Sequence, residues 1–158
     1  MDTKSFKILL VDDEPDILEI LSYPLKNQGF QVHTANNGLE AIKLSKDIQP
    51  HLIILDVMMP EMDGIEACEI IRKDPKISNS LVTFLSARGE DYSKIAGLNA
   101  GADDYITKPI KPKVLVSKVK SLLRRISLEK SDLIETKNLT IDRSGYKVIE
   151  NNKDIFLP

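Results

Sequence analysis

Five side chains suited to phosphoryl chemistry each follow a short apolar run of the sequence: Asp12, Asp13, Asp56, Ser86 and Lys108. The paired acids follow residues 7–11 and the third acid follows 52–55, whereas the hydroxyl follows 81–85 and the lysine follows 104–107. If these runs are strands of one parallel sheet, their carboxyl ends meet at one edge, which is where such sheets bind ligands. The pattern therefore predicts a pocket that combines three carboxylates, a hydroxyl and an ammonium group.

The predicted pocket suits a divalent cation and a phosphoryl group. Carboxylates that cluster at the end of a sheet raise one another's pKa unless a cation neutralises them. An all-oxygen site with few protein ligands favours Mg²⁺, and Mn²⁺ is the second candidate. Lys108 and Ser86 could cradle a tetrahedral dianion. Asp56 has no acidic neighbour in the sequence and is the preferred phosphoryl acceptor, whereas Asp12 and Asp13 are better suited to hold the metal.

Each of these residues also has an ordinary structural explanation. An acid that follows a strand often caps the next helix, so Asp12 or Asp13 alone would more often be a cap than a ligand. Asp56 alone would be a turn residue, and the Lys108-Pro109 step alone would be a loop. A suitable group follows four of the five predicted strands, and this joint occurrence favours the functional interpretation. The remaining run, 31–35, leads only to an Asn-Asn-Gly turn.

Strand and helix patterns alternate from residue 5 to about residue 125. The predicted strands are 6–11, 31–35, 52–56, 81–85 and 103–107. Helical patterns follow each of them, and Pro24 is expected to kink the first helix. Helix 4 is expected from about Asp91 to Ala100, and helix 5 after Pro112. The alternation predicts an α/β fold, a flavodoxin-like doubly wound parallel sheet with strand order 2-1-3-4-5.

Composition narrows the class of protein. The chain has 158 residues, of which 42% are hydrophobic, so it can bury a sizeable core. A formal net charge of −2 does not suggest a nucleic-acid binder. Cys68 is the sole cysteine, which fits a reducing compartment. The first residues carry no apolar signal core, and no apolar run is long enough to span a bilayer. We therefore expect a cytoplasmic protein without a membrane partner.

The pattern changes after Arg125. Residues 126–137 are polar and are interpreted as a linker. Residues 139–142 and 146–150 are typical of two strands joined by a turn at Arg143-Ser144-Gly145. A β-hairpin of this size is marginal by itself. We therefore interpret residues 138–158 as the first strands of a second domain.

The chain resembles the receiver domain of bacterial two-component response regulators. The resemblance covers residues 5 to about 125, and it rests on the segments 8–14, Leu55 to Gly64, 85–88 and 102–109. Residues 138–158 are similar to the N-terminal strands of the winged-helix effector domain of the OmpR/PhoB-type subfamily. In this interpretation DNA binding requires the part of the effector domain that the chain does not contain.

The resemblance implies a role for each residue of the pocket. Asp56 would accept a phosphoryl group from a phosphohistidine of a sensor histidine kinase. Asp13, Asp56 and the backbone carbonyl of Met58 would bind Mg²⁺, and Asp12 would act mostly through a bound water. Lys108 would contact the phosphoryl oxygens from a cis Lys108-Pro109 peptide.

The resemblance also implies a switch and an output surface. Ser86 would hydrogen-bond the new phosphoryl group, and Tyr105 would then rotate from an exposed to a buried position. Helix 4, strand 5 and helix 5 would form a homodimer face. Its charged residues would be Lys94, Asp103, Asp104, Lys118 and Arg125. Val114 stands where relatives commonly have an acid, so the ion pairs of this face are expected to be fewer or rearranged.

Two other functions remain open for a sheet of this kind. An aspartate-nucleophile phosphatase of the haloacid dehalogenase type also uses a strand-end aspartate and Mg²⁺, but it usually has a second acid where this chain has Met58. A flavodoxin-like binding module needs a phosphate loop of Ser, Thr and Gly, where Asp12-Asp13-Glu14 would repel a phosphate. We therefore expect no enzyme in the usual sense, only self-catalysed phosphoryl transfer to Asp56 and slow dephosphorylation.

Overall fold

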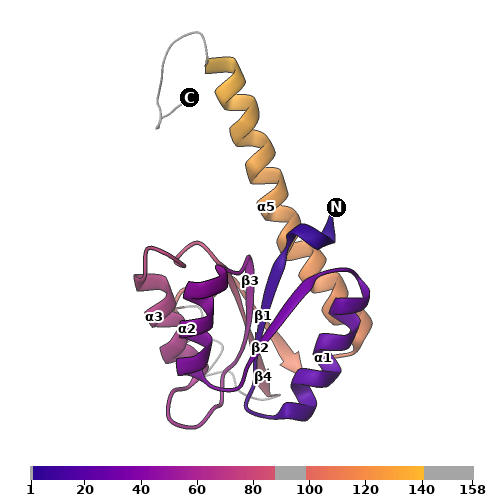
Figure 1. Ribbon diagram of the computed structural model, residues 1–158, viewed down its shortest axis with the longest axis vertical. Coiled ribbons are helices and arrows are strands. Elements are labelled where there is room, and N and C mark those ends of the chain that lie inside the picture. The colour runs from indigo at the N-terminus through magenta and orange to yellow at the C-terminus, as the bar shows by residue number, and fades with distance from the viewer. Residues whose placement is uncertain (1, 88–98, 141–158) are drawn as a thin grey trace. The chain divides into compact units, whose positions relative to one another are not determined.

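A computed structural model of the chain describes residues 2–87 and 99–140, with the backbone alone for 127–140 (Figure 1). The described part holds five parallel strands in the order β2-β1-β3-β4-β5, which confirms the predicted fold. The strands are β1 (Lys7–Val11), β2 (Gln31–Ala35), β3 (Leu52–Asp56), β4 (Leu81–Ala87) and β5 (Asp104–Lys108). The described helices are η1 (Thr3–Ser5, 3₁₀), α1 (Pro15–Asn27), α2 (Gly38–Ile48), α3 (Gly64–Lys73) and α5 (Pro112–Thr140).

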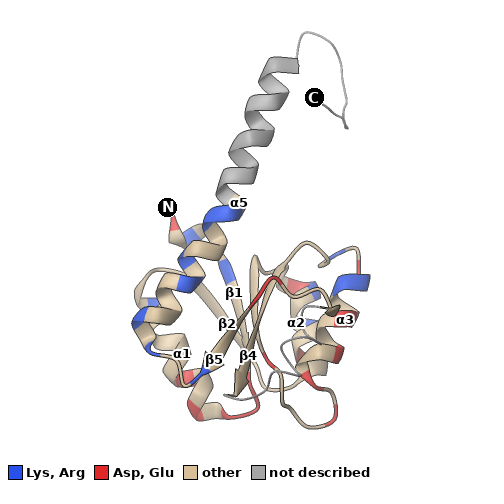
Figure 2. Cartoon of the chain, turned by 180° about the vertical axis from the view of Figure 1, so that it is seen from behind, with Lys and Arg blue, Asp and Glu red and all other residues tan. Residues whose placement is uncertain are grey.

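The sheet is buried because helices cover both of its faces. α2 and α3 lie on one side and α1 lies on the other, as the views from the front (Figure 1) and from behind (Figure 2) both show. All five residues of β3 are buried, as expected for the central strand of a covered parallel sheet. Apolar side chains of the sheet and of α2 and α3 form one core cluster, which includes Leu9, Ile53, Phe84, Ala67 and Ile71.

Polar side chains cap the first turns of α2 and α3. The side chain of Asn37 accepts a hydrogen bond from the backbone N–H of Glu40 at 2.8 Å, at the start of α2. Asp63 does the same for Glu66 at the start of α3, also at 2.8 Å. Such caps satisfy backbone donors that the first helical turn leaves without partners. α1 begins with Pro15 and continues through Pro24 to Asn27 without interruption.

The region after Arg125 differs from the prediction in its secondary structure. α5 continues to Thr140, so the segment expected as a linker is helical, and so are residues 139 and 140 of the expected first strand. The physical reason is composition: residues 127–137 contain Leu, Glu and Lys, which favour helices, and neither Gly nor Pro. The rest of the predicted hairpin lies outside the described residues, as does most of predicted helix 4.

The chain divides into two compact units, 1–120 and 121–158. The first unit contains the complete sheet and α1, α2 and α3, together with the start of α5. Leu115 and Val119 are buried in that first part of α5. The second unit contains the remainder of α5. The predicted boundary between receiver, linker and effector domain stays a prediction.

Candidate functional site

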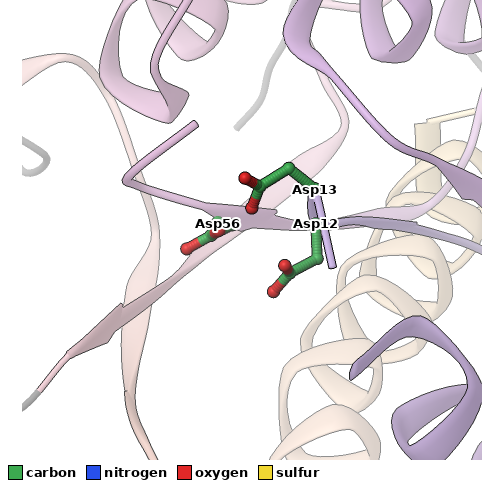
Figure 3. A group of neighbouring side chains, drawn as sticks. All are labelled: Asp12, Asp13 and Asp56. Carbon is green, nitrogen blue, oxygen red and sulfur yellow. The ribbon is translucent and has the colours of Figure 1, made fainter. Parts of the chain in front are cut away.

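The strand register brings the three predicted acids together. Val11 of β1 lies beside Leu55 of β3, so the next residues along the two strands, Asp12 and Asp56, are neighbours at the carboxyl edge of the sheet. Asp12, Asp13 and Asp56 each offer a carboxylate oxygen, and these oxygens all lie within 4.8 Å of one another (Figure 3). Asp12 and Asp56 are buried, whereas Asp13 is exposed. The cluster therefore has a buried floor and an open side.

Lys108 enters the same cluster from the end of β5. Its Nζ atom lies 3.0 Å from Oδ2 of Asp12 and 3.3 Å from Oδ1 of Asp56. The peptide bond between Lys108 and Pro109 is cis, which confirms the expectation from the resemblance. The ammonium group thus contacts both buried carboxylates, as the strand-end pattern predicted.

Burial and charge shift the protonation equilibria of the pocket. Burial, together with the negative charge of Asp12, raises the pKa of Asp56 to about 6, although Lys108 opposes the shift. For Lys108 the order of effects is different. Burial lowers its pKa, but the hydrogen bond to Asp12 and the charges of Asp56 and Asp12 outweigh burial, so the pKa is raised overall. The pocket thus holds three carboxylates and one ammonium group. This excess of negative charge favours the binding of an additional cation.

The donor set fits Mg²⁺. Hard divalent cations of this size prefer oxygen ligands and keep several waters, so a cluster of carboxylates open on one side suits them.

The capping explanation does not account for the two adjacent acids. The N-cap of α1 is Glu14, and Asp12 accepts a hydrogen bond from the backbone N–H of Glu14 at 3.0 Å, just before the helix. Asp13 is exposed and points toward the cluster in Figure 3.

The loop between β3 and α3 begins with a hydrogen bond to the sheet and ends with a hydrogen bond to its own first residue. The N–H of Val57 donates to the carbonyl of Leu85 in β4 at 3.0 Å, and its carbonyl accepts from the N–H of Gly64 at 2.8 Å. Met58, whose backbone carbonyl was predicted as a metal ligand, is part of this loop. Its side chain is 64% exposed and therefore packs little.

The predicted switch residues lie on β4 and β5. Ser86 is buried, and it follows Leu85, the residue of β4 that pairs with Asp56. Its own partner in β5 is Thr107. Tyr105 is half-buried on β5 and packs against the core cluster. The two residues therefore lie on neighbouring strands, two residues apart in register.

The predicted dimer residues have different surroundings. Lys118 and Asp104 form an ion pair of 3.0 Å. Asp103 instead accepts hydrogen bonds at 2.8 Å from both Arg72 Nη2 and the backbone N–H of Val82. Arg125 is exposed in the second unit. Lys94 lies outside the described residues.

Sequence reasoning missed the role of Arg72. Its guanidinium group donates to the carbonyls of Gly101, Ser78 and Ser80 as well as to Asp103. The only sequence signal was a basic residue in the last turn of a helix, which usually indicates an interaction with the helix dipole.

Comparison with known proteins decides the family. The model of the response regulator receiver domain matches residues 8–120, which is more than half of the chain. The chain belongs to this family. Receiver domains are phosphorylated by sensor kinases and bind Mg²⁺ at an acidic pocket, which here corresponds to the cluster of Asp12, Asp13 and Asp56.

Relatives of this receiver domain are DNA-binding response regulators of the OmpR/PhoB type. The chain is 36% identical over 157 residues to the DNA-binding response regulator MtrA of Mycobacterium tuberculosis, an alignment that covers 99% of this chain and 68% of MtrA. It is 38% identical over 161 residues to the transcriptional regulatory protein SrrA of Staphylococcus aureus, with 97% and 66% covered. The receiver domain is thus similar to those of transcription regulators in two-component systems.

Solved structures agree on the receiver fold. A putative response regulator from Chloroflexus aurantiacus has a TM-score of 0.72 at 36% identity, and the match covers 75% of this chain and 98% of that one. The chemotaxis response regulator CheY4 of Vibrio cholerae has a TM-score of 0.70 at 29% identity, with 74% and 98% covered. Among the residues that the structure describes, no helix combines the length and apolar character needed to cross a membrane.

Proposed function

We propose that Asp56 is the phosphoryl acceptor of this receiver domain and that Mg²⁺ binds between Asp13, Asp56 and the Met58 carbonyl, with Asp12 acting through a water. The observation that carries the proposal is the convergence of three carboxylates within 4.8 Å beside the Lys108 ammonium group. Buried, like-charged acids are costly unless a cation is bound among them. Mn²⁺ meets the same requirement and is expected to replace Mg²⁺.

In the proposed reaction, a carboxylate oxygen of Asp56 attacks the phosphorus of a phosphohistidine on a sensor histidine kinase. The new P–O bond gives an acyl phosphate, the P–N bond breaks, and its electron pair returns to the imidazole, which takes up a proton. Mg²⁺, when bound, offsets negative charge on the phosphoryl oxygens. Lys108 offers a second positive charge to these oxygens, and it already lies 3.3 Å from Asp56. Such fixed charges stabilise developing charge without reorganisation.

We further propose that Ser86 and Tyr105 transmit the modification. A phosphoryl group adds about −1.5 to −2 charge and three acceptor oxygens, by analogy with phosphorylated hydroxyl residues. The Ser86 hydroxyl is one residue beyond the strand partner of Asp56 and can donate to such an acceptor after a small motion. Tyr105 lies on the adjacent strand and is already half-buried, so its rotation would complete the change.

The output we propose is homodimerisation through helix 4, β5 and α5, which in a complete regulator would control binding to DNA. The ion pair between Asp104 and Lys118 lies on this surface, beside the exposed Val114. We propose the cytoplasm as the location, because a sensor kinase and DNA are the partners. Sedimentation of the chain with and without beryllofluoride, a phosphoryl mimic, tests the dimer. A protein that stays monomeric at high concentration with the mimic bound contradicts it.

The phosphatase and flavodoxin-like alternatives are not favoured. A phosphatase of the haloacid dehalogenase type needs a general acid two residues after the nucleophile, and Met58 cannot donate a proton. A flavodoxin-like module needs a phosphate loop after β1, where the acids of the cluster stand. Multiple-turnover hydrolysis of varied phosphate esters would favour the first alternative, and a bound yellow flavin the second.

The central test is phosphorylation by a small acyl phosphate donor such as acetyl phosphate, with and without Mg²⁺. Wild type is expected to incorporate one phosphoryl group per chain only when Mg²⁺ is present, and the label should be labile to hydroxylamine, as an acyl phosphate is. Asp56→Asn should remove the label, and Asp13→Asn should raise the Mg²⁺ concentration that labelling requires. Equal labelling of Asp56→Asn and wild type contradicts the assignment of Asp56.

A further inference from the structure

Gly64, the first residue of α3, lies against the backbone of the proposed phosphoryl acceptor. A Cβ atom built on Gly64 would overlap the carbonyl oxygen of Asp56, and it would lie 3.0 Å from both the carbonyl carbon of Asp56 and the Cα of Val57. All three are backbone atoms of β3 or of the residue after it, so they cannot turn aside as a side chain would. The φ angle of Gly64 is not in the left-handed region. Glycine is therefore required at residue 64 because the start of α3 lies so close to the backbone of Asp56 and Val57, and not because of its own backbone conformation.

The same approach closes the loop that carries the proposed metal-binding carbonyl. The N–H of Gly64 donates to the carbonyl of Val57 at 2.8 Å, so the loop 57–63 returns to its own starting point. Asp63, directly before the glycine, caps the helix through the N–H of Glu66. Met58 lies between these two attachments. Its carbonyl has a fixed position relative to Asp56 only if α3 begins this close to the strand.

We infer that Gly64 is a positioning residue for metal binding and phosphoryl transfer at Asp56, because it lets α3 begin in contact with the Asp56 and Val57 backbone and so fixes the loop that carries the Met58 carbonyl. The inference rests on the proposed function of Asp56. Any side chain at residue 64 moves either the end of β3 or the start of α3, and both movements change the distance between the carboxylate and the carbonyl.

Gly38 provides a matched control within the same domain. It is also the buried first residue of a helix, and it also follows a side chain that caps that helix. A Cβ atom on Gly38 would lie 2.9 Å from Cγ and Sδ of Met62, which are atoms of a flexible side chain. Met62 belongs to the same loop and can change rotamer. Gly38→Ala therefore disturbs the same loop without pressing on the backbone of Asp56.

The test compares wild type, Gly64→Ala and Gly38→Ala by Mg²⁺ titration calorimetry, by labelling with acetyl phosphate and by thermal unfolding. Gly64→Ala is expected to lose about tenfold or more in Mg²⁺ affinity, the size typical of lost support behind a metal ligand. Its labelling rate should stay low at saturating Mg²⁺, because misplacement of the reacting group persists when the metal is bound. Gly38→Ala should stay within about threefold of wild type in both measurements.

The variant Asp63→Ala distinguishes the proposed positioning role of Gly64 from a general destabilisation of the start of α3. This variant removes the cap of α3 but leaves the glycine in place, so it should lower the melting temperature with little loss of Mg²⁺ affinity. If Asp63→Ala and Gly64→Ala lose stability and affinity in the same proportion, the positioning role is wrong. If wild type itself binds no Mg²⁺, the proposed function fails as well; if wild type binds it and Gly64→Ala binds it equally, only the inference about Gly64 fails.

A measurement on wild type covers the case in which Gly64→Ala does not fold. Mg²⁺ binding to the Met58 carbonyl should hold the loop 57–63 closed, so exchange of the Gly64 amide hydrogen should slow by about tenfold or more when Mg²⁺ is saturating. The Gly38 amide should change less. An exchange rate at Gly64 that Mg²⁺ leaves unchanged overturns the inference.

Discussion

The ammonium group of Lys108 lies 3.0 Å from Asp12, closer than its 3.3 Å separation from Asp56. A lysine at the end of an outer strand therefore neutralises the acids that end two inner strands. Both acids are buried, so the ion pairs replace part of the hydration that the carboxylates lose on folding. The proposed Mg²⁺ ion and Lys108 both offset the negative charge of the same carboxylates. The stability of the metal-free domain is therefore sensitive to the side chain of Lys108.

Lys108→Ala is expected to destabilise the metal-free protein at pH 7.5 by about 2 kcal/mol, because it leaves buried carboxylates without their cation. Saturating Mg²⁺ should restore much of the loss, since the metal supplies positive charge to the same acids. Urea unfolding with and without Mg²⁺ measures both effects. Lys118→Ala, which removes the partner of Asp104 instead, is the control and should cost about 0–1 kcal/mol irrespective of Mg²⁺. Equal losses in the two variants would contradict the prediction.

The pKa of Asp56 makes the metal-free stability depend on pH. Because this pKa is raised in the folded state from 3.8 to about 6, the folded protein binds more protons than the unfolded chain between these values. The ionised Asp56 is therefore unfavourable to folding above about pH 6, and this penalty disappears as the pH falls toward 4. Asp56→Asn, which resembles the protonated form, should stabilise the metal-free protein at pH 7.5 by about 1–2 kcal/mol after allowance for solvent screening.

Urea unfolding of wild type and Asp56→Asn at pH 7.5 and pH 4.5, without divalent cations, measures this effect. The stabilisation by Asn should be largest at the higher pH and fall to about a third of that value at the lower one, because pH 4.5 lies between the unfolded and folded pKa values of Asp56. Other titrating groups are common to both proteins and cancel in the difference. A difference in stability that does not change between the two pH values would show that Asp56 has an ordinary pKa in the folded protein.

The sequence alone supports most of the site because its residues follow strands. Apolar runs of strand length identified β1, β3 and β5, and in a parallel sheet the residues after them must share an edge. That rule is sufficient to bring Asp12 and Asp56 together, and it placed Lys108 at the same edge. It says nothing of the distances, of the sharing of Lys108 between two acids, or of the close approach of Gly64 to Asp56.

Contacts of side chains outside the strand ends lie beyond such a rule. Asp103 was predicted at the dimer face from the resemblance, and the structure adds that it accepts hydrogen bonds from Arg72 and from the backbone N–H of Val82, which are distant in sequence. No periodicity connects these positions. Likewise, the polarity of residues 126–137 suggested a linker, although their helix propensity agrees with the continuous helix to Thr140.

Cys68 is expected to be unreactive in the native protein. Burial raises the pKa of its thiol to about 11, with a smaller opposing effect from Arg72, and its Sγ atom lies 3.6 Å from the carbonyl oxygen of Ala100. The thiolate is the reactive form, and at pH 8 almost none of it is present. Because the chain has a single cysteine, labelling with a chromogenic disulfide reports on this site alone. Labelling should be complete in urea and slow without it; rapid native labelling would contradict the burial.

Arg72 is expected to matter more for stability than its position near the surface suggests. It lies at the end of α3 and donates to three backbone carbonyls, those of Ser78, Ser80 and Gly101, as well as to Asp103. Arg72→Ala removes all of these bonds and leaves partly buried acceptors without a donor, which should cost about 2–3 kcal/mol. Lysine lacks the planar fork that reaches several acceptors at once, so Arg72→Lys should recover less than half of the loss.

The neighbouring exposed residue, Lys73, is the matched control on the same helical turn. Lys73→Ala should change the free energy of unfolding by no more than about 0.5 kcal/mol. Urea unfolding of the three variants and wild type at constant pH and salt gives the comparison. Since both single changes disrupt the same bond between Arg72 and Asp103, Asp103→Asn combined with Arg72→Ala should cost less than the sum of the single changes. Strict additivity would mean that the two side chains do not act as a unit.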